Sequence, residues 1–270
     1  MNNMLHLLKI DLKKLGNYRT FWVVCGLYFV TLAFVTASGM EFLKLLARMI
    51  EGFGASININ RIPLYHFPDV WLNLIWFCGC FKVVLAIMVV ISVTNEFSYR
   101  TLRQNVIDGL SRSQFLWSKI LTNVLLSLMS VAMIFVIGLV TGLIYSPSVV
   151  YSFIFTDTEF FIAYFLEIFF FLSYALLISV LIQRSGLTII LLLLSQMIEW
   201  IITANIDDEL PWIEHFFPMK SIWYLIEFPY IRYGFQEIKD YIDIKLFLIA
   251  SAWAVLFNYI SYLKLKKSDI

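Results

Sequence analysis

Charged residues are scarce in this sequence. Asp, Glu, Lys and Arg make up 14% of the 270 residues, whereas soluble domains carry about a quarter. Hydrophobic residues make up 61%, and several apolar runs reach the roughly 20 residues that a helix needs to cross a bilayer. The formal net charge of +1 gives no overall basic field for nucleic acid. The composition therefore predicts an all-α polytopic membrane protein in contact with lipids and without a nucleic-acid partner.

Sequence motifs for nucleotide and hydrolytic chemistry are missing. No Gly-x-x-x-x-Gly-Lys-Ser/Thr phosphate loop occurs, and neither does His-Glu-x-x-His or Gly-x-Ser-x-Gly. The 3 histidines are scattered, which predicts no metal site. Cys25, Cys78 and Cys80 fall in apolar runs, which is typical of small buried hydrophobes rather than of disulfides or metal ligands. We therefore expect that the chain is not an enzyme, hydrolyses no ATP itself and binds no cofactor or metal.

The apolar runs predict six membrane-spanning helices in a single domain, residues 1–270. Their approximate ranges are 20–38, 70–94, 120–145, 160–182, 187–204 and 246–263. In the third span, Gly138 and Gly142 have a spacing that lets two helices approach closely, although two glycines can also share a span by chance.

Three segments outside these spans have patterns of their own. In residues 1–19, apolar residues share one face of a helix and polar or charged residues share another, which predicts an amphipathic helix lying in the membrane interface. Residues 39–69 predict a loop on the outer surface with an amphipathic piece. Residues 205–245 are rich in aromatic side chains and divided by prolines, which predicts short interfacial or re-entrant helices between spans five and six.

Positive charge predicts the orientation in the membrane. Lys and Arg are densest on the side that holds the N-terminus, residues 95–119, the turn at 183–186 and the C-terminus. Because cytoplasmic loops carry the excess of Lys and Arg, this side is expected to be the cytoplasm, with both termini inside.

Residues 95–119 form the most polar segment of their length between two spans. Apolar residues from Tyr99 to Leu110 recur at helical spacing, which predicts a short amphipathic helix. Gly109 lies where a helix end prefers a residue that adopts positive φ. Ser111 and Gln114 have the spacing of a capping box, so a new helix is expected to begin near Arg112.

This segment resembles the first cytoplasmic loop of the ABC-2 type transporter permeases. In that family the loop carries a glutamate, then a Gly-Thr pair, then Ser-Arg, and a Lys that opens the third span. Glu96, Thr101, Ser111-Arg112 and Lys119 stand at these positions. Arg100 replaces the usual glycine, and Gly109-Leu110 replaces a turn that commonly contains proline.

The resemblance implies that the short helix is a coupling helix, which inserts into a groove of a separate ATP-binding subunit that holds ATP and Mg. The residues expected at this junction are Glu96, Tyr99, Arg100, Thr101, Leu102, Arg103, Val106, Ser111, Arg112 and Lys119. The alternative from spacing alone is an ordinary loop lying on the membrane surface.

The same resemblance implies the membrane-spanning subunit of an exporter. It would work as a dimer with a second permease copy, identical or paralogous, in the inner membrane of a bacterial cell. Two other hypotheses remain open at this point. One is an ion-coupled secondary transporter, and the other is a membrane scaffold that transports nothing.

Three charged residues, Lys82, Glu167 and Glu199, lie inside apolar runs. An ionised side chain near the bilayer centre costs about 2.5–3.5 kcal/mol even on a mild scale, so these groups are expected to face the protein interior or a wet pathway. The spacing lets Lys82 reach Glu167, either as a structural ion pair or as part of a substrate pathway or proton relay. Glu199 has no evident cation at its depth, so it is the stronger candidate for the pathway or for a dimer interface.

Overall fold

The structure is a computed structural model that describes residues 2–51, 65–146, 154–206, 211–229 and 241–267. All regular structure in these residues is helical. The long helices are α2 (Arg19–Glu51), α4 (Lys82–Ser98), α6 (Arg112–Tyr145), α8 (Phe160–Ile182), α9 (Ser185–Thr203) and α11 (Ile244–Lys267). The shorter ones are α1 (Asn2–Asn17), α3 (Val70–Gly79), α5 (Thr101–Ile107), the 3₁₀ helix η2 (Pro211–Phe216) and α10 (Pro218–Trp223).

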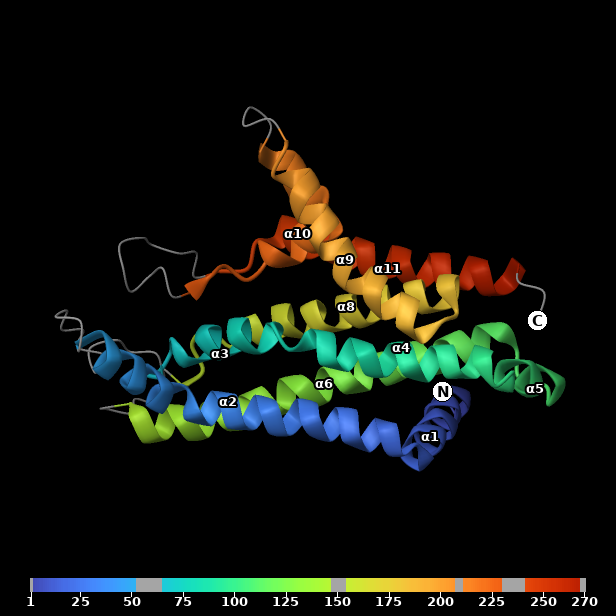
Figure 1. Ribbon diagram of the computed structural model, residues 1–270, viewed down its shortest axis with the longest axis horizontal. Helices are drawn as coiled ribbons and strands as arrows, with labels where there is room; N and C mark the ends of the chain where they lie inside the picture. The colour runs from blue at the N-terminus through green and yellow to red at the C-terminus, as the bar shows by residue number, and fades with distance from the viewer. Residues whose placement is uncertain (1, 52–64, 147–153, 207–210, 230–240, 268–270) are drawn as a thin grey trace.

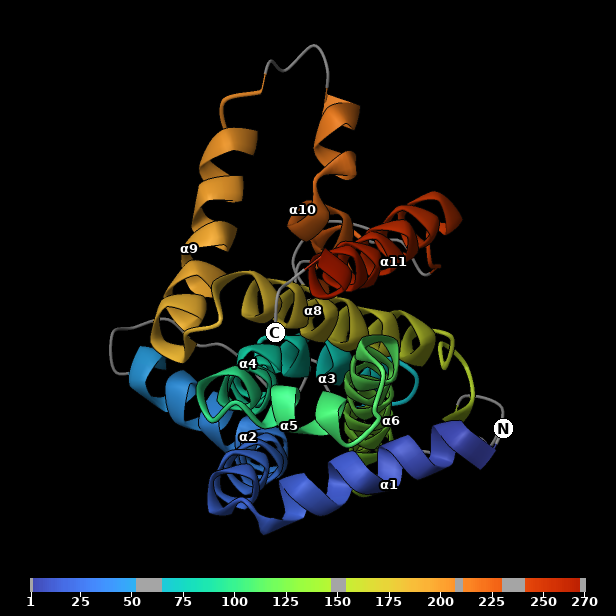
Figure 2. The ribbon, with the colours of Figure 1, turned by 90° about the vertical axis from the view of Figure 1, so that its right-hand side faces the viewer.

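Helix α8 is the centre of the bundle. Its sequence is apolar on all faces, and a helix of this kind is stable only where other helices or lipid surround it. It packs against α4, α6, α9 and α11, and Figure 2 shows it between them. Its bounds, Phe160–Ile182, agree with the predicted fourth span.

The described helices include four that are long and apolar enough to cross a membrane, α6, α8, α9 and α11. The pair α3 and α4 passes the same test as a fifth span, although it is bent by 42°. The chain is therefore an integral membrane protein with four to five candidate spans in its described part.

The predicted second span, 70–94, is broken rather than continuous. Helix α3 ends at Gly79 and α4 begins at Lys82, with Cys80 and Phe81 between them. Glycine has a low helix propensity, which favours the break at Gly79. A Cβ at this position would lie 2.7 Å from Oε1 of Glu167, so glycine also leaves room for that carboxylate. Cys25 and Cys78 are buried as predicted, whereas Cys80 at the break is exposed.

The helix at the predicted first span is longer than expected, but its apolar part, Arg19–Phe34, is shorter than the candidate spans named above. Helix α2 continues past residue 38 to Glu51, so the outer loop predicted from residue 39 begins as helix. The amphipathic piece follows the apolar run without a proline, and Gly39 alone does not end a helix. The hydroxyl of Tyr65 packs against Gly39 and donates to the carbonyl of Thr36 at 2.7 Å. Residues 52–64 of the predicted loop lie outside the described residues.

The glycines of α6 make room for aromatic rings of the preceding segment. A Cβ on Gly138 would lie 2.6 Å from Cζ3 of Trp71, and one on Gly142 would meet the ring of Phe67. Trp71 is completely buried, and its indole donates to the carbonyl of Ile154 at 2.8 Å. The predicted close approach is therefore an approach of α3 to α6.

The remaining boundaries agree with the sequence to within a few residues. Helix α1 covers the predicted amphipathic helix 1–19, and it lies across one end of the bundle (Figure 2). In the predicted segment 205–245 the structure describes η2 and α10, whereas residues 207–210 and 230–240 lie outside the described part.

The elements predicted to share one side of the membrane lie at one end of the molecule. Helix α1, helix α5, the turn between α8 and α9, and the C-terminal end of α11 gather at the right of Figure 1. Helix α9 leans away from the other long helices (Figures 1 and 2). Because these elements gather at one end, α5 lies beside α1. Because α9 leans away, it is less covered by other helices than α8 is.

Candidate functional site

The turn that carries α5 has the local structure expected from its sequence. Arg100 precedes α5 in the left-handed conformation, with φ of 56°, and Gly109 follows it with φ of 97°. The hydroxyl of Ser111 accepts from the amide of Gln114, and the Gln114 side chain accepts from the Ser111 amide at 2.8 Å. The predicted capping box is confirmed, and α6 begins at Arg112.

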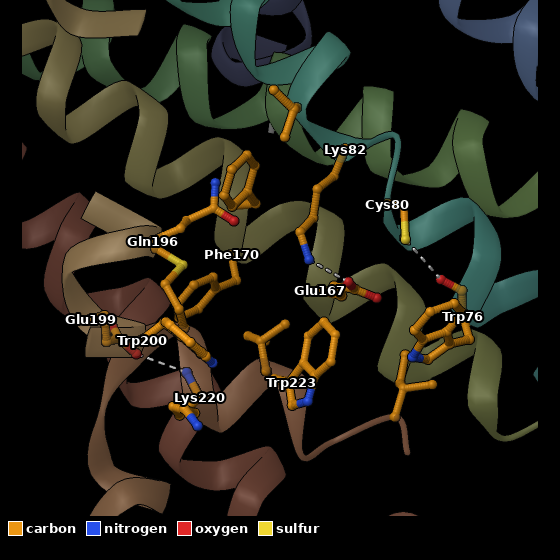
Figure 3. A pocket seen from close by; sticks show the side chains of 16 residues that line it. Trp76, Cys80, Lys82, Glu167, Phe170, Gln196, Glu199, Trp200, Lys220 and Trp223 are labelled. Carbon is orange, nitrogen blue, oxygen red and sulfur yellow. Dashed lines mark hydrogen bonds and ion pairs between the residues drawn. The ribbon is translucent and has the colours of Figure 1, made fainter. Parts of the chain in front are cut away.

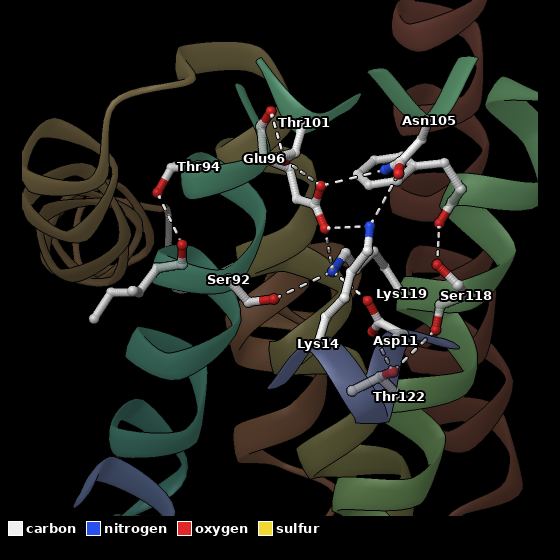
Figure 4. A network of polar contacts seen from close by, with 12 residues as sticks. Asp11, Lys14, Ser92, Thr94, Glu96, Thr101, Asn105, Ser118, Lys119 and Thr122 are labelled. Carbon is white, nitrogen blue, oxygen red and sulfur yellow. Dashed lines mark hydrogen bonds and ion pairs between the residues drawn. The ribbon is translucent and has the colours of Figure 1, made fainter. Parts of the chain in front are cut away.

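A buried ion cluster lies beneath α5 (Figure 4). The ammonium of Lys119, whose residue is 4% exposed, lies 2.6 Å from Oδ1 of Asp11 and 3.6 Å from Oε1 of Glu96. Lys119 also donates to Ser92 at 3.2 Å, and Thr122 donates to the second Asp11 oxygen at 2.6 Å. The cluster therefore joins α1, α4 and α6.

Helix α5 is attached to the same cluster. The Thr101 hydroxyl donates to Oε2 of Glu96 at 2.6 Å, and Lys14 lies 3.4 Å from Oε1 of that carboxylate. Lys14 also donates to the side-chain oxygen of Asn105 at 3.2 Å. Two lysines and two carboxylates thus balance in charge, and they hold α5 against α1, α4 and α6.

The residues predicted to contact an ATP-binding subunit divide into two groups. Glu96, Leu102 and Lys119 are buried, so they hold α5 in place. The exposed ones are Tyr99, Arg100, Arg103 and Ser111, and the half-buried ones are Thr101, Val106 and Arg112. The guanidinium of Arg112 donates to the carbonyl of Lys266 at 2.9 Å, which links α6 to the end of α11.

Sequence reasoning missed the contribution of α1 to this site. Asp11 is the only acidic residue in α1, between Lys9 and Lys13, and it is buried. A lone carboxylate in a basic helix, close to the apolar face of Leu8 and Leu15, is the signal that could have identified it. Its partner Lys119 lies more than a hundred residues away, so the pairing itself required the fold.

Replacing Arg100 by glycine is expected to raise the free energy of unfolding by about 1 kcal/mol. An L-residue in the left-handed region costs roughly 1–2 kcal/mol, and glycine adopts it freely. The melting temperature in detergent measures the effect. The matched control is Arg103→Gly, because Arg103 is an exposed residue inside α5, where glycine is expected to cost about 1 kcal/mol. A lower melting temperature for Arg100→Gly would contradict this account.

A second site lies within the bundle, where α3, α4, α8, α9 and α10 surround a cavity of about 500 Å³ (Figure 3). Its walls are aromatic and charged. The side chains that characterise it are Trp76, Lys82, Glu167, Glu199, Trp200 and Trp223. The three intramembrane charges predicted from the sequence therefore line one cavity.

The predicted pairing of Lys82 with Glu167 is confirmed. Lys82 is the first residue of α4, and its ammonium lies 2.6 Å from Oε1 of Glu167 on α8. The same ammonium lies 5.5 Å from the centre of the Phe171 ring, a distance at which a cation is attracted to an aromatic face. The break between α3 and α4 brings this lysine to the cavity wall.

Glu199 has a backbone partner that the sequence did not reveal. Its Oε1 accepts from the amide of Lys220 at 2.8 Å, at the first turn of α10. The side chain of Lys220 instead pairs with Glu214 at 3.1 Å. Hydrogen bonds from Lys220 and Tyr224 lower the pKa of the Glu214 carboxyl below its ordinary value. Within the described residues, no side-chain cation forms an ion pair with Glu199.

Residues 63–270 match the model of a family described as "Protein of unknown function (DUF2705)". The chain belongs to this family, because the match covers more than half of its length. The matched range contains α3 to α11, and therefore the whole cavity and α5, whereas Asp11 and Lys14 lie before it. No curated protein matches the chain.

Proposed function

We propose that this chain is the membrane-spanning subunit of an ABC-2 type transporter that works as an exporter. Two permease copies, identical or paralogous, form the pathway, and separate ATP-binding subunits hold ATP and Mg. The observation that supports this proposal is α5, a short helix with exposed residues on its outer side, whose inner side is bonded to the bundle. It has the position that the family resemblance gives to a coupling helix.

The buried cluster gives α5 a mechanical role. Glu96 and Lys14 tie α5 to α4 and α1, and Lys119 continues the connection to α6. Breaking a buried pair costs about 3–5 kcal/mol, so the four helices are expected to move as one body when a partner displaces α5. Helix α4 leads directly to Lys82 at the cavity, which connects the docking surface to the proposed pathway.

The proposed orientation places α5 and both termini in the cytoplasm of a bacterial cell, at the inner membrane. The dense Lys and Arg of this end support it. Helix α2 supplies the remaining span of the six-helix arrangement. Its apolar part, Arg19–Phe34, continues as helix to Glu51, so the 33-residue helix has a length of about 50 Å at 1.5 Å per residue, and the proposed span includes residues beyond Phe34.

The exposed residues on and beside α5 form the proposed docking surface, and substitutions there are expected to prevent binding of the ATP-binding subunit. Ile107 and Tyr99 are exposed on and beside α5, whereas Leu102 is 1% exposed and a charge there would disturb folding. Purified from its own membranes in mild detergent, the wild-type chain is expected to bring vanadate-sensitive ATP hydrolysis with it. Ile107→Asp is expected to reduce this co-purified activity at least tenfold, because a buried charge without a partner opposes docking.

The matched control is Ile244→Asp. Ile244 is as exposed as Ile107, at 73%, but it begins α11, whereas the C-terminal end of α11 is the end that lies on the side of α5 (Figure 1). This variant is expected to keep the ATP hydrolysis of the wild type. Equal loss in both variants, or no ATP hydrolysis with the wild type, would count against the proposal.

The second candidate function is ion-coupled secondary transport. Lys82, Glu167 and Glu199 around one cavity favour it, because intramembrane carboxylates commonly carry protons or ions. Reconstituted in liposomes without an ATP-binding subunit, a secondary transporter would move substrate in response to a pH gradient. The transporter subunit proposed here is expected to move none under those conditions.

A further inference from the structure

We propose that the cavity between the α3–α4 break, α8, α9 and α10 binds an amphipathic organic cation, a ligand with an apolar aromatic or aliphatic body and a single positive charge. That this ligand is the transported substrate rests on the proposed function. Its binding to the cavity rests only on the chemistry of the walls. The cavity volume of about 500 Å³ lies within the range of small-molecule sites.

The apolar body of the ligand is accommodated by aromatic walls. Trp76 comes from α3, Trp200 from α9 and Trp223 from α10, so three separate elements each present an indole to one space (Figure 3). The rings of Trp76 and Trp223 are 6.2 Å apart in an edge-to-face arrangement. Phe170 and Phe171 of α8 add two phenyl rings. Aromatic faces attract organic cations, and the structure already shows this for the ammonium of Lys82 over Phe171.

The charge of the ligand follows from counting the ionisable groups around the cavity. Lys82 neutralises Glu167 at 2.6 Å, and Lys220 neutralises Glu214 at 3.1 Å. Glu199 is the acidic group that remains, with a backbone amide as its hydrogen-bond donor. A carboxylate has about four acceptor sites, so this bond leaves it able to receive a cation. Lys82, Lys220, Glu167 and Glu199 line the cavity, and because the ammonium of Lys220 is bound to Glu214, which lies outside this lining, Glu199 is the lining carboxylate that a cationic ligand would neutralise.

An anionic ligand of the same shape is disfavoured by the same geometry. The cations it could approach at the wall are Lys220, whose ammonium is bound to Glu214, and Lys82, whose ammonium is bound to Glu167. An anion that took this ammonium would leave Glu167 without its partner, in a cavity that already contains the Glu199 carboxylate. Like charges repel strongly where little water screens them.

The cavity can be reached from the side of α9. Trp200 lines the cavity and is also 64% exposed, because α9 leans away from the other long helices (Figures 1 and 3). Amphipathic cations gather in the interfacial region of a membrane, where apolar bodies and polar heads are both accommodated. We therefore expect a ligand of this class to enter the cavity from the membrane, past α9.

Two ions of matched shape and opposite charge test the proposal. Tetraphenylphosphonium and tetraphenylborate differ in the sign of a single central charge. In titrations of the purified full chain followed by tryptophan fluorescence, the phosphonium is expected to bind at least tenfold more tightly than the borate. Equal binding of both ions, or tighter binding of the borate, would overturn the proposal, and this comparison needs no variant.

Matched variants then locate the binding. Glu199→Gln is expected to remove the preference for the cation, whereas Glu159→Gln, the same change at an exposed position outside the cavity, is expected to keep it. Trp200→Leu is expected to weaken phosphonium binding at least fivefold, and Trp212→Leu, which also replaces an exposed tryptophan, is expected to leave it unchanged. Phosphonium binding that neither Glu199→Gln nor Trp200→Leu alters would place the ligand elsewhere and overturn the proposal.

The phosphonium-binding test does not depend on whether an ATP-binding subunit is present. Phosphonium binding to a chain that brings no ATP hydrolysis with it would support the cavity assignment and contradict the transporter assignment. Co-purified ATP hydrolysis without phosphonium binding would contradict the cavity assignment alone.

Discussion

Replacing Lys119 by methionine is expected to lower the free energy of unfolding by about 3–5 kcal/mol, the usual cost of removing one member of a buried ion pair. Asp11 would lose its ammonium partner at 2.6 Å while remaining buried. The Thr122 hydroxyl would still donate to Asp11, but a neutral hydroxyl does not balance the charge. Unfolding in mixed micelles measures the loss.

A second substitution identifies the cause of this loss. Asp11→Asn in the Lys119→Met background is expected to recover more than half of the stability, because the stranded charge is then removed. The matched control is Lys264→Met, an exposed lysine of α11, with an expected effect below about 0.5 kcal/mol. A double variant no more stable than Lys119→Met would show that packing rather than charge is responsible.

The second large effect is expected at the cavity. Lys82→Met leaves the Glu167 carboxylate without its ion-pair partner inside the bundle, and the loss is again about 3–5 kcal/mol. Lys82→Met combined with Glu167→Gln is expected to recover most of it if the pair is structural. Melting temperature in detergent follows the stability of each variant.

Phosphonium binding separates the structural role of this pair from a role in binding. The double variant retains Glu199, so it is expected to keep its preference for tetraphenylphosphonium over tetraphenylborate. A stable double variant that has lost this preference would show that Lys82 and Glu167 themselves hold the ligand. A double variant as unstable as Lys82→Met would contradict the structural pairing.

The local structure around α5 could be predicted because its signals lie within a few residues. The capping box needs Ser111 and Gln114 alone, and the turn needs a glycine at 109. Arg100 shows why the resemblance is informative even where the residue differs. The ABC-2 type permeases that this loop resembles usually have glycine at this position, and here the arginine adopts the left-handed conformation, with φ of 56°.

The pairing of Lys82 with Glu167 could also be predicted, because depth in a span follows from counting residues at a fixed rise. The partner of Glu199 could not. It is a backbone amide of Lys220, and any residue other than proline presents one, so the sequence contains no signal for it. The break at Gly79 was missed for a related reason, since the apolar run continues through it without interruption.

The ion cluster changes how the motif of the loop is interpreted. Glu96, Thr101 and Lys119 stand at positions that the resemblance associates with docking, and in this structure they bond to one another or to α1. Their hydrogen bonds and ion pairs hold α5 in place. The contact surface proposed for the ATP-binding subunit is then made by exposed neighbours such as Tyr99 and Ile107.

The central claim is that the outer surface of α5 contacts an ATP-binding subunit, and photo-cross-linking tests it most directly. A photoreactive amino acid replaces Ile107 in the full chain, its native membranes are irradiated, and the product is identified by mass spectrometry. Ile244, equally exposed and at the end of α11 that lies away from α5, is the control position. The account predicts a cross-link from position 107, and not from 244, to a polypeptide with a phosphate-binding loop. Cross-links from position 107 to lipid alone, or to a protein without that loop, would contradict it.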